Sequence, residues 1–129
     1  MLKISREVDL GLLLLTDLAK TGETVRLKDW AEKKDLPYRF LSKIAVKLKK
    51  SGFLKSKEGR EGGYRLARSA KKMFVGEIVE ALEGPIVPVR CMRDEECSCE
   101  KGCGHKDLMG KMSKVMEDQL GKVSLASLC

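Results

Sequence analysis

Residues 36–54 read Leu36-Pro-Tyr-Arg-Phe-Leu-Ser-Lys-Ile-Ala-Val-Lys-Leu-Lys-Lys-Ser-Gly-Phe-Leu54, and they decide the fold. Their apolar side chains recur at i, i+3, i+4 and i+7, which predicts a helix over residues 37–51 with one apolar face. That face consists of Leu41, Ile44, Ala45 and Leu48. The opposite face consists of Arg39, Ser42, Lys43, Val46, Lys47 and Lys50. One apolar face and one basic face are typical of a helix that reads DNA. A surface helix whose lysines only contact solvent has the same pattern, however.

Two more helices are predicted before this one. The first begins at Ser5, which can cap its N-terminus, and ends at Gly22. Its four consecutive leucines, residues 12–15, make it apolar around most of its circumference, so we expect it to pack on more than one side. The second covers residues 27–34, and Pro37 then suits the first position of the helix that follows. Together these elements predict a helix-turn-helix.

A hairpin is predicted after the third helix. Gly52 ends that helix, residues 53–56 and 64–67 resemble short strands, and a flexible turn, Lys57-Glu-Gly-Arg-Glu-Gly-Gly63, joins them. A helix-turn-helix followed by such a hairpin is a winged helix, so the predicted fold is mainly α with a small β wing. In that architecture the third helix can enter the major groove, and Arg60 at the wing tip can reach the minor groove. The predicted DNA-binding residues are Lys28, Arg39, Ser42, Lys43, Lys47 and Arg60.

Composition and charge agree with a nucleic-acid partner. The chain has 129 residues and a net charge of +7. Residues 1–72 carry 19 Lys and Arg against 9 Asp and Glu, whereas residues 73–129 carry 7 against 10, so the N-terminal part is where a polyanion would dock. The longest apolar run, Leu10 to Leu15, is far shorter than the roughly 18 residues of a membrane span. We expect a cytoplasmic protein with no membrane partner, and in that compartment cysteines stay reduced.

Residues 90–105 carry four of the five cysteines and the single histidine, in the order Arg90-Cys-Met-Arg-Asp-Glu-Glu-Cys-Ser-Cys-Glu-Lys-Gly-Cys-Gly-His105. Thiolates are ligands for iron–sulfur clusters, zinc and copper(I). Zinc could take four cysteines from this loop, namely Cys91, Cys97, Cys99 and Cys103. The ligand pairs of structural zinc sites, separated by two to about four residues, are not present as a set, however. A disulfide framework would leave one of the five cysteines unpaired.

The chain therefore divides into three regions. Residues 1–84 form the predicted winged helix-turn-helix domain, and residues 85–104 the cysteine-rich metal-binding loop. Residues 105–129 form a long amphipathic helix and a tail. The apolar residues of that helix recur at helical spacing and are Leu108, Met112, Val115, Met116, Leu120 and Val123. Such a helix packs either on its own core or on a second subunit.

The order of several motifs resembles the Rrf2 family of bacterial winged-helix regulators over nearly the whole chain. The motifs are residues 36–54, then Gly59-Arg-Glu-Gly-Gly-Tyr-Arg-Leu-Ala67, then Ile78-Val-Glu-Ala-Leu-Glu-Gly84, then the cysteines. Within that family the cysteine spacing is similar to the iron–sulfur branch typified by IscR and NsrR. The resemblance implies that Cys91, Cys97 and Cys103 hold an iron–sulfur cluster, 2Fe-2S in preference to 4Fe-4S. It also implies a homodimer, with the C-terminal helix crossing the first helix of a second subunit.

The resemblance leaves three candidates for a fourth ligand. Some family members place a histidine three residues after the last cysteine, whereas His105 follows Cys103 by two. Others use an aspartate on the first helix of the partner subunit, which corresponds to Asp9. Cys99 is the third candidate, since it is the nearest spare thiolate. Asp9 could equally be a first-turn acid that favours the helix dipole, and His105 a surface residue. Cys129 is predicted to be a frayed, non-ligating thiol.

Three functions follow as expectations. The first is a transcription regulator whose binding to double-stranded promoter DNA is controlled by the cluster. The alternative is a clusterless or zinc-bound winged-helix regulator that responds to a small molecule or a protein partner. The third is a small redox enzyme or electron carrier. The sequence has no nucleophile–base pair and no phosphate-binding loop, so no enzyme is expected.

Overall fold

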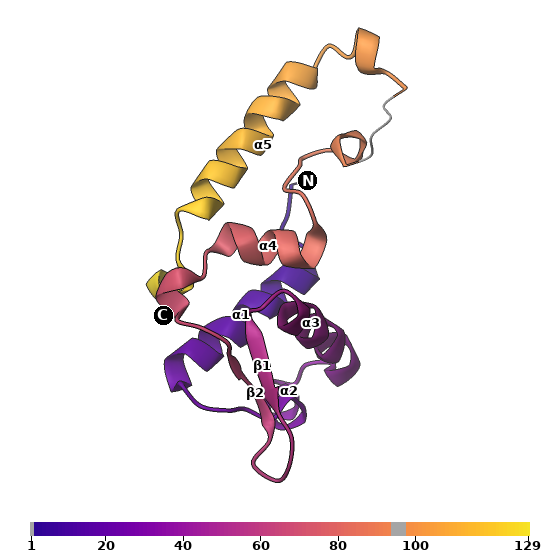
Figure 1. The fold of residues 1–129 in the computed structure, drawn as a ribbon. Helices are drawn as coiled ribbons and strands as arrows, with labels where there is room; N and C mark the ends of the chain where they lie inside the picture. Colours follow the sequence, from indigo (N-terminus) through magenta and orange to yellow (C-terminus); the bar gives the residue numbers. More distant parts are fainter. Residues whose placement is uncertain (1, 94–97) are drawn as a thin grey trace.

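The computed structural model describes residues 2–93 and 98–129, and Figure 1 shows their arrangement. The first helix, α1 (Arg6–Thr21), begins where Ser5 Oγ accepts a hydrogen bond of 3.2 Å from the Val8 N–H. It ends at Gly22, whose φ of 66° is left-handed and whose N–H donates to Leu18 O. Both capping predictions are confirmed.

Helix α1 lies at the centre of the core. Its buried side chains contact the third and fourth helices on one side and the C-terminal turn on another. They include Leu10, Leu14, Leu15 and Leu18. Gly11 faces Leu82 and Ile44 so closely that a Cβ there would collide with the Leu82 side chain. The predicted packing of this helix on more than one side is confirmed.

The helix-turn-helix consists of α2 (Leu27–Lys34) and α3 (Tyr38–Lys50). Asp35, with a φ of 54°, turns the chain between them. Pro37 precedes the first helical residue instead of occupying it, one position earlier than predicted. Trp30 Nε1 donates a 2.9 Å hydrogen bond to Asp17 Oδ2, which fixes α2 against α1.

The wing is an antiparallel pair of strands, β1 (Leu54–Lys57) and β2 (Gly63–Leu66), in which Leu54 pairs with Leu66. Both strands are displaced by one residue from the prediction, β1 toward the C-terminus and β2 toward the N-terminus. Val25, before α2, exchanges two 2.8 Å backbone hydrogen bonds with Tyr64 along the outer edge of β2. At Gly63 the φ is 147°, and a Cβ would collide with Val25 O, so this close approach requires glycine.

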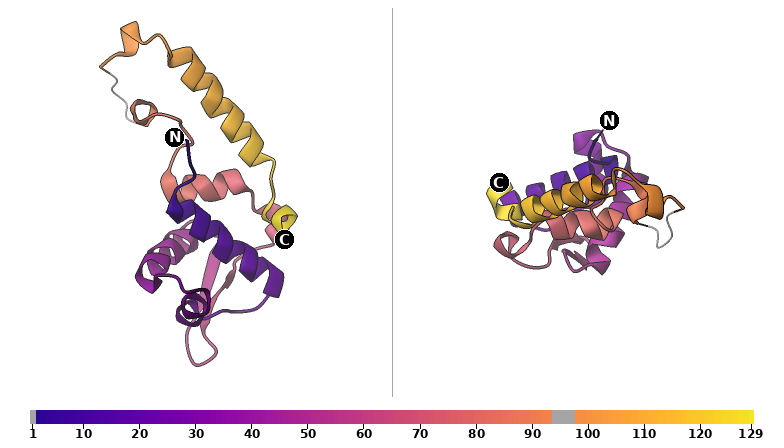
Figure 2. Two further views of the ribbon diagram at one scale, coloured as in Figure 1. Left: turned by 180° about the vertical axis from the view of Figure 1, so that it is seen from behind. Right: turned by 90° about the horizontal axis from the view of Figure 1, so that it is seen from above.

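Helix α4 (Val75–Glu83) packs on α1 and α3, and the chain then leads through the cysteine loop to α5 (Lys106–Gly121). Figure 1 and the left view of Figure 2 show α5 extending away from the winged helix, so that the wing and the cysteine loop lie at opposite ends of the molecule. The C-terminal end of α5 is held to the body because Val75 N donates to Val123 O and Leu125 N donates to Met73 O. In the middle of α5, buried Ser113 Oγ donates a 2.7 Å hydrogen bond to Ile86 O. Among the described residues, no helix is both long and apolar enough to cross a membrane.

Candidate nucleic-acid interface and cysteine loop

Helix α3 has the two faces that its sequence predicts. The four apolar residues of its inner face are completely buried; they are Leu41, Ile44, Ala45 and Leu48. On the outer face Arg39, Lys43, Val46 and Lys50 are exposed, and Ser42 is half-buried at its border. The helix is therefore anchored by one side and presents cations on the other.

Lys47 lies at the flank of this outer face and contacts the protein itself. Its Nζ is 2.6 Å from Glu7 Oε1 on α1 and also donates to Leu82 O, near the end of α4, at 3.3 Å. The predicted binding of Lys47 to DNA thus competes with its contacts to Glu7 and Leu82. Lys49 is engaged similarly, since its Nζ donates to Ser56 Oγ of the wing at 2.6 Å.

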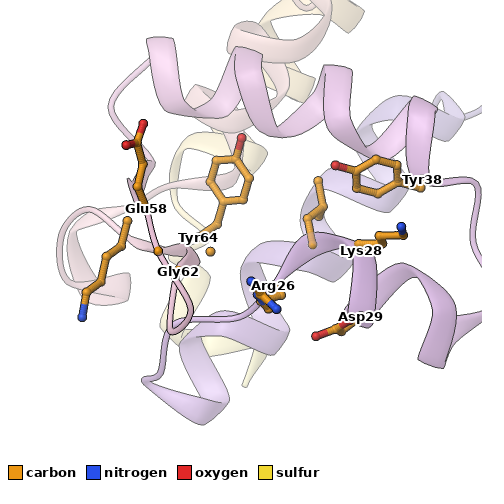
Figure 3. A pocket seen from close by; sticks show the side chains of 11 residues that line it. Arg26, Lys28, Asp29, Tyr38, Glu58, Gly62 and Tyr64 are labelled. Atoms are coloured by element: carbon orange, nitrogen blue, oxygen red, sulfur yellow. The ribbon is translucent and has the colours of Figure 1, made fainter.

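A groove of about 490 Å³ separates the helices from the wing (Figure 3). Figure 3 shows Lys28 and Tyr38 on the helical side and Glu58 and Gly62 on the wing side. The charged residues that line it are Arg26, Lys28, Asp29, Lys57 and Glu58. Three cations against two anions leave it weakly basic, and the predicted residue Lys28 lies in its wall.

Sequence reasoning missed Arg26, Tyr38 and Lys57 as residues of this groove. They come from three separate elements, and only the folding of the wing beside α2 brings them together. The sequence contained one indication of this role. Arg26 and Tyr38 each lie at the N-terminal end of a helix that follows a turn. Arg60 is exposed in the turn of the wing, which the hydrogen bond from Gly62 N to Gly59 O closes.

The cysteine loop begins just after α4 and ends at the start of α5. Cys91 lies in a short 3-10 turn, Arg90–Met92, and Cys103 directly follows another, Glu100–Gly102. Cys91 and Cys99 are exposed, whereas Cys103 is half-buried. Cys97, the middle member of the predicted ligand set, lies outside the described residues. The three predicted ligands therefore stay a prediction.

The candidates for a fourth ligand lie on different elements. Asp9 is exposed in the first turn of α1, the position that also favours the helix dipole. His105 is exposed immediately before α5, and Cys99 Sγ lies 3.8 Å from Ser98 Oγ. Among the residues for which the structure gives positions, no three His, Cys, Asp or Glu side chains gather as a metal site. Within one described chain these candidates are not brought together.

Cys129 differs from its prediction of a frayed terminus. A final 3-10 turn, Leu125–Leu128, precedes it, and its N–H donates to Ala126 O. Its exposed thiol lies 3.5 Å from Leu125 O and 3.8 Å from Thr16 O of α1. Buried Leu125 anchors this turn in the core, which explains why the end of the chain is held.

Helix α5 buries little of its apolar stripe within one chain. Leu108 is 55% exposed and Val115 is 67% exposed, and the one buried residue of α5 is Ser113. Met116 and Leu120, nearer the C-terminal end, are partly buried against the core. Leu108 and Val115 of the stripe thus stay open to solvent.

Comparison with known proteins matches nearly the whole chain to one family. The family model described as "Rrf2: Iron-dependent Transcriptional regulator" matches residues 4–129. Protein rrf2 of Nitratidesulfovibrio vulgaris is 32% identical over 130 residues, which cover 98% of this chain and 87% of that protein. Two solved structures are similar at 31% identity. CymR (YrzC), the global cysteine regulator of B. subtilis, has a TM-score of 0.78 over 99% of this chain and 96% of its own. T. potens IscR has a TM-score of 0.75 over 98% of this chain and 85% of its own.

Proposed function

Because this chain belongs to the Rrf2 family of transcriptional regulators, we propose that it binds promoter DNA as a homodimer under the control of an iron–sulfur cluster. The observation that carries the DNA-binding part is the pair of opposite faces on α3. Four completely buried apolar side chains fix the helix, and Arg39, Lys43 and Lys50 are exposed on its other side. A helix held in this way can enter a major groove without rearrangement.

The contacts to DNA divide into two kinds. Arg39, Ser42 and Lys43 lie on the outer face of α3, where side chains of these types can bind base edges. We assign phosphate and minor-groove contacts to Lys28, in the wall of the groove between α2 and the wing, and to Arg60, exposed in the wing turn. Binding should therefore weaken steeply as the salt concentration rises.

The donor chemistry of the loop supports the cluster. Cys91, Cys97 and Cys103 are three thiols at six-residue intervals, and thiolates are the usual protein ligands of iron–sulfur clusters. Cys99, His105 and Asp9 of the partner subunit are the candidates for a fourth position. A bound cluster supplies a group that responds to iron supply, oxidation or nitric oxide. We propose 2Fe-2S in preference to 4Fe-4S.

A physical connection between the loop and α3 supports the control of DNA binding. The loop begins at the end of α4, and the Leu82 carbonyl at that end accepts a hydrogen bond from Lys47 of α3. Any change in the loop that shifts the end of α4 therefore acts on the DNA-facing helix. Helix α4 also packs directly on α3, which strengthens this connection.

The exposed apolar residues support the homodimer. Leu108 and Val115 of α5 and Leu13 of α1 are large apolar side chains open to solvent in a single chain. A second subunit that covers them, related to the first by a two-fold axis, would give the dimer two α3 helices. Each of these helices can read one half-site of the DNA.

A clusterless regulator is the second candidate, and the structural similarity to CymR, the global cysteine regulator of B. subtilis, favours it. A redox carrier is a third possibility, which failure to bind any promoter DNA would favour.

Anaerobic purification tests the proposal. Iron and sulfide analysis, visible absorption and electron paramagnetic resonance on one preparation distinguish 2Fe-2S, 4Fe-4S and zinc. The same preparation, with and without its cluster, is then titrated with promoter DNA. Coloured protein whose DNA affinity depends on the cluster supports the proposal. Colourless protein that binds DNA specifically supports the clusterless alternative.

A further inference from the structure

We infer that Val46 reads the methyl group of a thymine in the DNA site, and this inference rests on the proposed DNA binding. Val46 is an apolar side chain on the outer face of α3, which it shares with the exposed cations Arg39, Lys43 and Lys50, and it is 42% exposed. Among the described residues, Val46 is not one of the partly buried apolar side chains that pack against the core, and the core side of α3 is filled by four other residues.

The position of Val46 on α3 matches that of a base-reading residue. Arg39, Ser42, Lys43 and Val46 follow one another at i, i+3, i+4 and i+7, so they form one stripe along the helix. The recognition helix of homeodomains uses the same spacing to read the major groove. At 1.5 Å per residue, Val46 lies about 10 Å farther along the helix than Arg39. It is therefore placed at a different base pair of the same site.

The chemistry of the side chain restricts what it can read. Val46 has no donor or acceptor, so it cannot recognise a base edge by hydrogen bonding. In the major groove thymine alone presents a methyl group, and apolar side chains contact it. Arg39 and Lys43, by contrast, suit the acceptors of guanine. The stripe thus combines polar readout with one apolar position.

Single exposed apolar residues are common on protein surfaces, so exposure alone does not distinguish Val46. Its location relative to the other exposed apolar residues does. Among the described residues, the remaining large exposed apolar side chains besides Tyr38 lie near the N-terminus, on α1, in the cysteine loop, on α5 or in the last turn. They are Leu2, Ile4, Leu13, Met92, Leu108, Val115 and Leu128. Val46 is separate from that set and lies among the DNA-facing cations.

The test begins with selection of binding sites by the wild-type dimer from randomised duplexes at fixed salt. Each thymine of the selected site is then replaced, one at a time, by deoxyuridine, which removes only the methyl group. Loss of one buried methyl contact should weaken wild-type binding by about fourfold at one thymine position. The other thymines of the site act as internal controls.

The variant Val46→Ala completes the comparison, with Lys50→Ala as the control on the same helix. Val46→Ala should bind the thymine and deoxyuridine sites equally, whereas Lys50→Ala should bind both more weakly and keep the fourfold difference. The absence of any enriched sequence would contradict the proposed function. An enriched sequence with no deoxyuridine-sensitive thymine, or an unchanged difference in Val46→Ala, would overturn this inference alone. The deoxyuridine scan uses the wild-type protein and stays decisive if a variant fails to fold.

Discussion

Lys47 and Glu7, forty residues apart in sequence, form an ion pair of 2.6 Å between α3 and α1. The same ammonium donates to Leu82 O of α4, so one side chain joins three helices. The pair is partly exposed, with 48% of Lys47 and 24% of the Glu7 side chain accessible, and such pairs contribute about 1 kcal/mol or less to stability. Its main consequence concerns the orientation of Lys47, which is turned toward the protein.

Glu7→Gln should therefore release Lys47 toward DNA. We expect tighter binding to random and selected DNA alike, and a slope of log affinity against log salt that is steeper by about one phosphate contact. The matched control is Glu23→Gln, which removes the same charge from an exposed position in the turn after α1. Equal slopes for the two variants would show that loss of the ion pair with Glu7 does not free Lys47 to contact a phosphate.

Lys47→Ala tests the same residue from the other side. It should weaken binding to selected and random DNA to a similar degree, because a cation held by Glu7 attracts DNA only through its charge, which carries no sequence information. The free energy of unfolding should fall by about 1 kcal/mol or less. Binding titrations and urea unfolding measure the two effects separately. A loss confined to the selected site would indicate that Lys47 reads a base.

Arg39→Ala and Lys43→Ala should reduce discrimination between selected and random DNA. Each lost base contact is worth about 1–3 kcal/mol of discrimination. Arg39→Lys serves as the control for charge, because it keeps the cation and loses the two-pronged geometry. Affinity ratios at one salt concentration give the measurement. Equal losses on both DNAs would contradict the assignment of these residues to base reading.

Gly63→Ala should destabilise the wing. The new Cβ would collide with Val25 O at a φ of 147°, and both effects together should cost roughly 2 kcal/mol or more. Gly110→Ala, in the middle of α5 with open space around it, is the control and should stabilise the chain slightly. Urea unfolding compares the two. If Gly63→Ala were as stable as the wild type, the Val25–Tyr64 contact would have to be looser than it is in the structure.

Cys97→Ala should give colourless protein that still folds and dimerises, because the core that the described residues form contains no cysteine. Cys129→Ala, at the opposite end of α5, should keep the iron and sulfide content of the wild type. Metal analysis, circular dichroism and sedimentation provide the three readouts. Unfolding of the Cys97 variant would indicate a structural role for the loop cysteines.

Local patterns predicted much of the fold. The spacing of Leu41, Ile44, Ala45 and Leu48 identified the buried face of α3, and the cap at Ser5 and the end at Gly22 follow from the chemistry of single residues. Strand limits were displaced by one residue, because alternation is a weak signal in strands of four residues. The winged helix-turn-helix was thus accessible from the sequence.

The site was less accessible, because its contacts join residues that are distant in sequence. The sequence places Lys47 on a basic face but does not reveal that Glu7 and Leu82 occupy its ammonium group. The groove exists only because the wing folds beside α2, and the sequence does not reveal this arrangement. Arg26 and Tyr38 were therefore not predicted to line it. The spacing of the apolar residues of α5 likewise did not predict whether they pack on the core of the same chain or on a second subunit.

The bridge between Val25 and Tyr64 also bears on solubility. A strand edge with unpaired backbone groups can recruit a strand from another molecule and start aggregation. Here Val25 occupies the outer edge of β2 at Tyr64, and β1, which forms the other edge, carries Lys55 and Lys57. Charged lysines on an open edge repel an identical neighbour. A protein that must keep a small exposed sheet available for DNA therefore keeps that sheet from pairing with its own copies.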